Sequence, residues 1–295
     1  MAYSLLTAQQ DDIICPLTHY SLIQIAGTEA EKYLQGQLTC DVTKLAVGES
    51  TLTAHCDPKG KMSALFRLIR QDEQTFYMLL KSELLPSALD QLKKYAVFSK
   101  VTFTLLDWQI LGAAGTKGIE KCGQFSVQIR INVKAQQPRM ILLNPTRLAL
   151  EPTVEAEAWD LLDIQDGIPS LAAATQLEFI PQALNLQSIE QAISFQKGCY
   201  IGQETVARAK YRGANKRALF IFEAQTQSLP DIGSALEMAL GDNWRVTGSI
   251  TSAVNFHGVL WLQAVLNTPL EEGQAFRLPN SQTLLDMQPL PYELS

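Results

Sequence analysis

The sequence predicts an α+β protein with two helix-and-strand regions and a small β-barrel at its C-terminal end. Three observations carry this prediction. Residues 22–106 follow the order strand, helix, paired strands, helix, strand, which is a ferredoxin-like order. Strands and a helix alternate again over residues 108–212. After Arg217, short strands separated by Gly, Asn and Pro replace the helices, as is typical of a small barrel.

In the first region, two helices have recognisable starts. Thr28 and Glu31 form a capping-box pattern, which predicts a helix of about three turns. Ser82 caps the second helix, and Pro86 stands in its first turn, where a missing N–H is tolerated. The strands are predicted over residues 22–26, 50–56, 62–70, 75–80 and 101–106. The turn-forming residues 57–60 (DPKG) join the middle pair.

The remaining elements divide the chain into three expected domains. The second region has predicted strands over residues 109–113, 125–131 and 139–143 and a helix over 154–164. The barrel strands are predicted over residues 218–223, 245–250, 259–266 and 275–278. The expected domain ranges are 1–106, 107–216 and 217–295, and the first two domains could interleave along the chain.

Length and composition describe an ordinary globular protein. The chain has 295 residues, of which 46% are hydrophobic and 18% charged, and this length allows two or three domains. Its five cysteines are Cys15, Cys40, Cys56, Cys122 and Cys199. Their odd number and the lack of a CxxC pair predict free thiols in a reducing compartment. The sequence shows neither a signal peptide nor a spanning apolar stretch, so a cytoplasmic protein without a membrane partner is expected.

Residues 197–204 (KGCYIGQE) form the most informative motif. Cys199 stands two residues after Lys197, shortly before a predicted helix that begins with Gln203 and Glu204. The positive end of a helix and a lysine charge both favour the thiolate, which is the reactive form of cysteine. Cys199 and Lys197 are therefore the candidate catalytic residues. The alternative is a buried, inert thiol, the more common state of a lone cysteine.

A basic cluster follows this motif. Between residues 197 and 217, six basic residues stand against one acidic residue, Glu204, which gives a local charge of +5 on a chain of formal net charge -6. The basic residues are Lys197, Arg208, Lys210, Arg212, Lys216 and Arg217. Such a cluster on an acidic protein predicts a polyanionic partner, either a glutamate tail or an RNA backbone. The alternative is a solvated helix face.

Trp159 is a separate candidate for ligand binding. At about 100° per residue, it points a quarter-turn or more away from the apolar stripe of its predicted helix. It either fills a seam between domains or offers a stacking platform to a flat heterocycle. The three histidines lack the spacing of metal ligands, so no metal site is expected.

Several segments resemble the YgfZ family. Its members are folate-binding proteins tied to tRNA modification and to the maintenance of iron–sulfur enzymes, and they are related to the glycine-cleavage T-protein. The matching segments are 31–42 (EKYLQGQLTCDV), 54–62 (AHCDPKGKM), 93–101 (KKYAVFSKV), 179–187 (FIPQALNLQ), 197–204 and 206–219 (VARAKYRGANKRAL). The resemblance implies an aminomethyltransferase-like fold around a central cavity. It also implies a tetrahydrofolate ligand, with or without a polyglutamate tail.

The same resemblance assigns roles to individual residues. The two aromatic folate contacts of the family align with Trp159 and with Tyr20, where the family more usually has tryptophan. Asp57 and Lys59 of the predicted hairpin are expected to face the cavity. Gln37 is expected to offer amide groups to the pterin ring. The rest of the expected cofactor-binding set is Gln203, Glu204, Arg208, Lys210 and Arg212.

Three functions fit these residues. The first is a folate-dependent accessory protein for tRNA modification and iron–sulfur enzymes, with a redox or one-carbon role for Cys199. The second is a true aminomethyltransferase. Ala88 argues against it, because the T-protein family has a catalytic aspartate at the aligned position, although Asp90 lies nearby on another face. The third is a folate- or tRNA-binding protein without catalysis. A monomer is expected, with folate, iron–sulfur enzymes that modify tRNA, or tRNA itself as partners.

Overall fold

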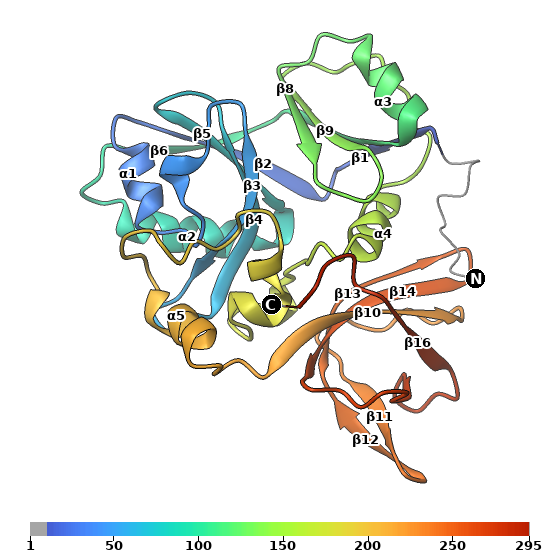
Figure 1. Ribbon diagram of the computed structural model, residues 1–295. Coiled ribbons are helices and arrows are strands. Elements are labelled where there is room, and N and C mark those ends of the chain that lie inside the picture. Colours follow the sequence, from blue (N-terminus) through green and yellow to red (C-terminus); the bar gives the residue numbers. More distant parts are fainter. Residues whose placement is uncertain (1–10, 295) are drawn as a thin grey trace.

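The computed structural model describes residues 11–294, which form three β-sheets flanked by short helices (Figure 1). Every strand pairing among these residues is antiparallel. The predicted α+β class is confirmed, and a doubly wound parallel sheet is excluded for this part of the chain. No helix within it is both long and apolar enough to cross a membrane.

The first sheet has the strand order β3-β4-β5-β2-β6. Its strands are β2 (Tyr20–Ala26), β3 (Ser50–Cys56), β4 (Met62–Arg70), β5 (Thr75–Lys81) and β6 (Thr102–Leu106), with helices α1 (Ala30–Gln35) and α2 (Leu85–Tyr95). Strands β6-β2-β5-β4 reproduce the ferredoxin-like order, and β3 extends it at one edge. The prediction of a three-turn first helix was wrong, since α1 has six residues and no side-chain cap. Glu31 instead pairs with Arg70 at 2.7 Å, so its carboxylate does not cap the helix.

The second sheet has the order β1-β7-β9-β8. It contains β1 (Ile13–Pro16), β7 (Gln109–Ala114), β8 (Ile129–Val133) and β9 (Arg139–Asn144), with helices α3 (Gly115–Gly123) and α4 (Glu157–Gln165). Neither β1 nor α3 is in the sequence prediction, and β8 begins at residue 129 rather than 125. Because α3 contains three glycines, its sequence gives only a weak helix signal. One of them, Gly118, packs so closely that an added Cβ would lie 2.6 Å from the carbonyl oxygen of Ile13.

The two sheets interleave along the chain. Strand β1, from the start of the described chain, belongs to the second sheet. The segment that follows α4 returns to the first sheet, where Phe179, Leu184 and Leu186 join its core. The amide of Met62 donates to the carbonyl of Phe179 at 2.9 Å and so ties this segment to β4. The ranges 1–106 and 107–216 stay predictions as domain limits.

The C-terminal region is a sheet of seven strands in the order β12-β11-β15-β16-β10-β14-β13. The strands are β10 (Arg217–Gln225), β11 (Leu236–Leu240), β12 (Asn243–Thr247), β13 (Ser249–Phe256), β14 (Val259–Asn267), β15 (Phe276–Arg277) and β16 (Leu284–Gln288). Gly248, with φ of +64°, divides the strand predicted over 245–250 into β12 and β13. Strands β11 and β16 lie outside the predicted set.

Helix α4 connects the second sheet to the C-terminal strands (Figure 1). Its residues Leu161 and Ile164 pack with Ile221, Val254 and Trp261 of those strands. On its other side, Trp159 and Leu162 join an apolar cluster shared by the first two sheets. Helix α4 therefore places Trp159 at the seam where these two sheets meet.

Candidate functional site

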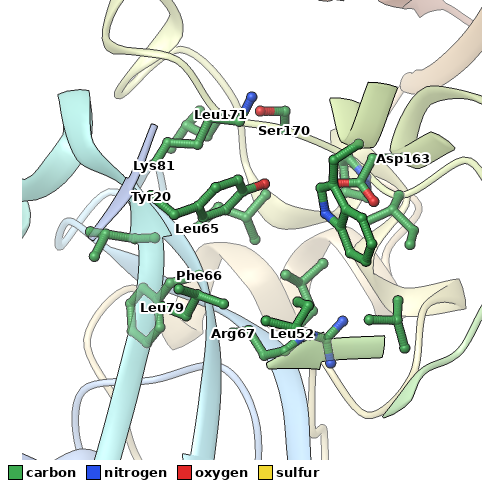
Figure 2. Close-up of a pocket in the computed structure, with 16 residues that line it drawn as sticks. Tyr20, Leu52, Leu65, Phe66, Arg67, Leu79, Lys81, Asp163, Ser170 and Leu171 are labelled. Carbon is green, nitrogen blue, oxygen red and sulfur yellow. The ribbon is translucent and has the colours of Figure 1, made fainter. Parts of the chain in front are cut away.

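A cavity of about 60 Å³ lies at this seam. Tyr20 at the start of β2 lines one side, and Trp159 and Asp163 of α4 also line the cavity. Figure 2 shows Tyr20 and Asp163 on opposite sides, with Arg67 at the lower edge. The other lining residues are Leu52, Leu65, Phe66, Leu79, Leu80, Lys81, Val133, Ile141, Ile168, Pro169, Ser170 and Leu171. No lining residue comes from the C-terminal strands, so the cavity belongs to the first two sheets and α4.

Trp159 is held firmly on this wall. It is only 2% exposed, and the guanidinium of Arg139 lies 4.1 Å from its ring centre. Gly112 packs so closely that an added Cβ would lie 2.4 Å from Cε3 of the indole. Trp159 fills the seam and also lines the cavity, so its use as a stacking platform stays a prediction. Its ring is preorganised for contact with a ligand.

Ion pairs surround the cavity and fix its charged groups. Arg139, with a fully buried side chain, donates to Asp163 at 2.5 Å and to Asp166 at 2.8 Å. Burial alone would lower the pKa of Arg139, but these two carboxylates raise it above its ordinary value. Lys81 donates to Asp160 at 2.8 Å, and His19 lies 3.2 Å from the same oxygen. The cations at this wall are therefore neutralised within the protein.

The polar groups left without partners suit a flat heterocycle. Neither the hydroxyl of Tyr20 nor the indole N–H of Trp159 has a hydrogen-bond partner among the described residues. Burial raises the pKa of Tyr20 well above its ordinary value, so its hydroxyl remains a donor. Asp163 adds an acceptor at the same wall. This set fits a pterin in chemistry, but small-molecule sites begin at about 300 Å³, so the cavity must widen to admit one.

The hairpin between β3 and β4 and the start of helix α5 (Gln203–Tyr211) meet at two glycines. A Cβ on Gly202 would lie 2.6 Å from the carbonyl oxygen of Asp57. A Cβ on Gly60 would lie 2.6 Å from Cβ of Thr205. Both glycines have positive φ, +83° and +77° respectively, so no other residue type fits easily at either position. The contact unites two segments that lie far apart in the sequence.

This junction lies away from the cavity. Asp57 and Lys59 do not line this cavity, so their placement toward a central ligand cavity stays a prediction. Their distance from the cavity follows from the length of β4. At roughly 3.3 Å per residue, Met62 beside the hairpin lies about 17 Å from Arg67 at the cavity. The predicted site residues thus fall into two groups, one at each end of this strand.

Lys197 anchors the motif but does not direct its charge at the thiol. Its Nζ donates to the carbonyl oxygens of Leu38 and Cys40, each at 2.7 Å. Burial lowers the pKa of Lys197 to about 8. The ring centre of buried Tyr200 lies 5.0 Å from the same Nζ. Lys197 is therefore a positioning residue, which holds the backbone two residues before Cys199.

Cys199 is exposed between these two buried anchors, whereas the other four cysteines are buried. Burial raises the pKa of Cys15 to about 12, and it also raises the pKa of Cys40, Cys56 and Cys122. None of the described ion pairs or hydrogen bonds involves the thiol of Cys199. The alternative of a buried, inert thiol does not apply to this cysteine.

The remaining predicted residues also lie outside the cavity lining. Gln37 is buried, and its Oε1 has no hydrogen-bond partner among the described residues. Gln203 is half-buried at the first turn of α5, and Glu204 pairs with Arg208 at 2.5 Å. Lys210 lies 5.6 Å from the ring centre of Phe195. Besides Lys197, which donates to two carbonyl oxygens, the residues of the basic cluster without an ion pair in the described chain are Lys210, Arg212, Lys216 and Arg217.

Sequence reasoning missed most of the charged groups around the cavity. They are His19, Arg67, Lys81, Arg139, Asp160, Asp163 and Glu190. One signal was present, because Arg67 interrupts the apolar run of β4 (MSALFRLIR) and a buried arginine needs a partner. The sequence did not identify that partner, Glu190, which lies 123 positions later.

Comparisons with known proteins agree with this architecture. Residues 6–128 match the model of the GCVT N-terminal domain, and residues 215–281 match that of the YgfZ β-barrel domain. A Haemophilus influenzae protein described as uncharacterised is 58% identical, over 95% of this chain and 98% of its own. The tRNA-modifying protein YgfZ of Escherichia coli K12 is 39% identical, over 94% of this chain and 92% of its own.

A solved structure extends the comparison to three dimensions. The glycine cleavage system aminomethyltransferase T from Bartonella henselae superposes with a TM-score of 0.70, over 95% of this chain and 86% of that chain. The two sequences are 14% identical, so this likeness concerns the fold alone. The chain has an aminomethyltransferase-like fold with a C-terminal β-barrel, as the sequence predicts.

Proposed function

The chain belongs to the YgfZ family, and on that premise we propose that it binds tetrahydrofolate at the cavity and acts in tRNA modification. Tyr20 and Trp159 would hold the pterin ring, and Asp163 would accept a hydrogen bond from it. Bound folate would supply one-carbon or reducing chemistry. The observation that carries the proposal is the pair of aromatic side chains with unpartnered polar groups in one cavity.

Aminomethyl transfer is less well supported than an accessory role. Ala88, at the position aligned with the catalytic aspartate of the T-protein, is buried in α2. Asp90 is exposed on the same helix, and neither residue lines the cavity. The carboxylate at the cavity is Asp163, which Arg139 engages at 2.5 Å. A free carboxylate is therefore absent from the lining of the cavity in the described chain.

The exposed thiol supports the accessory role. Cys199 does not line the cavity, so its redox or one-carbon role would be performed at the protein surface, on a partner. Iron–sulfur enzymes that modify tRNA are the proposed class of partner. A folate- or tRNA-binding role without turnover is the second candidate. If alkylation of Cys199 leaves the cellular phenotype intact, that result favours the binding role without turnover.

Calorimetric titration of tetrahydrofolate into the full chain tests the folate proposal. Trp159→Ala should weaken binding by about 1 kcal/mol, roughly fivefold, because an aromatic contact is lost. Trp159→Phe keeps a ring and should retain most of the affinity.

Trp244→Ala is the matched control for this titration. Arg277 lies 4.2 Å from the ring centre of Trp244, as Arg139 does from Trp159 at 4.1 Å, but Trp244 belongs to β12. The control variant should bind like the unmodified protein. Unchanged affinity in Trp159→Ala would remove Trp159 from the site, and no binding by the unmodified protein would refute the folate proposal.

A further inference from the structure

A second pocket, of about 280 Å³, adjoins the cavity along two strands. On β3, Leu52 lines the cavity, while Ser50 and Thr51 line the second pocket. On β8, Val133 lines the cavity, while its neighbours Asn132 and Lys134 line the second pocket. Neighbouring residues of β3 and β8 therefore line both spaces, which together are here called the groove.

An ion pair forms the wall between the two parts. Arg67 lines the cavity, and Glu190 lines the second pocket. The guanidinium of Arg67 donates to both carboxylate oxygens of Glu190, at 2.8 and 3.1 Å. The amide of Leu52 donates to the same carboxylate at 2.7 Å. Both side chains are more than nine-tenths buried. Hydrogen bonds rather than apolar contacts therefore hold this wall between the two spaces.

Glu190 holds this position against its backbone preference. Its φ is +47°, in the left-handed region that residues with a side chain rarely adopt. Such a conformation persists only where surrounding contacts enforce it, and it is common at switch segments. The three hydrogen bonds to the carboxylate are contacts of that kind. A competing carboxylate on Arg67 would remove two of them and release the strain.

We propose that the carboxylate of Glu190 occupies the place of a ligand carboxylate, and that the glutamate of a bound folate displaces it from Arg67. The inference rests on the proposed function. The planar fork of Arg67 would receive the incoming carboxylate in the same bidentate geometry. Lys134, exposed at the second pocket without an ion pair among the described residues, adds a positive charge. Glu49 also lines this pocket, and its carboxylate accepts from the amide of Ala46.

Displacement of Glu190 from Arg67 would also enlarge the space available to the ligand. The cavity alone is too small for a pterin, but the joined groove would reach the roughly 300 Å³ at which small-molecule sites begin. The ligand that opens the groove would then be one that carries both a flat ring and a carboxylate. Glu190 thus acts as a selectivity element, since a pterin without a carboxylate cannot compete for Arg67.

The test compares two ligands and three variants of the full chain by calorimetry. The ligands are tetrahydrofolate monoglutamate and 6-methyltetrahydropterin, which has no carboxylate. Glu190→Gln keeps the shape of the side chain but removes the competing charge, so tetrahydrofolate should bind on the order of tenfold more tightly. Arg67→Gln should weaken the binding of tetrahydrofolate. 6-Methyltetrahydropterin should bind the unmodified protein far more weakly than tetrahydrofolate does, because it has no carboxylate with which to displace Glu190 and open the groove.

Glu237→Gln is the control, because Glu237 pairs with Arg277 at 2.6 Å on strands away from the groove. It should leave both affinities unchanged. Thermal unfolding gives a second readout, since tetrahydrofolate should raise the melting temperature of Glu190→Gln more than that of the unmodified protein. Tight tetrahydrofolate binding that Glu190→Gln does not alter would overturn the displacement and leave the folate site standing. No binding of either ligand to any form would overturn both.

Discussion

The two ends of strand β4 carry opposite kinds of chemistry. At the cavity end, Arg67, Lys81 and Arg139 are each paired with a carboxylate. At the hairpin end, the thiol of Cys199 is exposed, and most of the basic cluster has no ion pair among the described residues. Gly60 and Gly202 fasten that second end together by backbone contact. One strand therefore joins a closed, neutralised site to an open, charged one.

This difference separates two tasks. Paired and buried charges have fixed positions, which suits the recognition of one small ligand. Exposed charges keep their hydration and their long-range field, which suits a large anionic partner that approaches from solvent. The family motif with the cysteine belongs to the second kind of surface, since Cys199 is exposed rather than a buried, inert thiol.

Alkylation of the five cysteines should show the largest contrast between the regions. Because burial raises the pKa of Cys15 from near 9 to about 12, its thiolate fraction at neutral pH falls about a thousandfold. Exposed Cys199 should react first with iodoacetamide in the native protein, as read by mass spectrometry. Cys199→Ser should lack the fast phase. Faster labelling of Cys40 or Cys122 would show that the exposed thiol is not the reactive one.

Substitution of Arg139 tests whether its buried ion pairs at the cavity wall stabilise the fold. Arg139→Gln leaves the carboxylates of Asp163 and Asp166 buried without their cation, so the free energy of unfolding should fall by about 3–5 kcal/mol. Arg277→Gln is the matched control, because Arg277 also contacts a carboxylate and a tryptophan ring but is more exposed. It should cost about 1 kcal/mol or less in urea denaturation. Equal losses would mean that burial does not distinguish the two pairs.

The basic cluster should give the smallest effect, and one that depends on salt. The preferred occupant is the part of a folate polyglutamate tail beyond its first glutamate, so polyglutamylated folate should bind more tightly than the monoglutamate by a margin that shrinks as salt is added. A double variant, Lys210→Gln with Arg212→Gln, should remove that margin, measured by calorimetry at two salt concentrations. Lys93→Gln with Lys94→Gln, on exposed α2, is the control. Equal affinity for both folates, together with salt-sensitive tRNA binding, would assign the cluster to RNA.

The sequence predicts best where its signal is local. Strands β3 and β4 have the predicted limits, because two apolar runs flank an unmistakable turn at residues 57–60. Helix α3 was not predicted because glycines weaken its helix signal, and the reason for Gly118, its close approach to Ile13 of β1, lies far away in the sequence. The site divides in the same way. Tyr20 was predicted through the family resemblance, and Trp159 through that resemblance and its position off the apolar stripe. The pair of Arg67 and Glu190 spans 123 positions and appears only when the chain is folded.

The return of the chain to its first sheet determines when, during synthesis, the core of that sheet can be completed. All five strands of that sheet have been synthesised by residue 106, but Phe179, Leu184 and Leu186 complete its core. At about 5–20 residues per second, the nascent sheet waits several seconds with part of its apolar face uncovered. In chains that terminate before these residues, that part of the apolar face of the sheet stays uncovered. Such fragments are expected to be substrates for chaperones and proteases. The cysteine motif at residues 197–204 follows Leu186 closely in the chain, so it is synthesised only after the residues that complete this core.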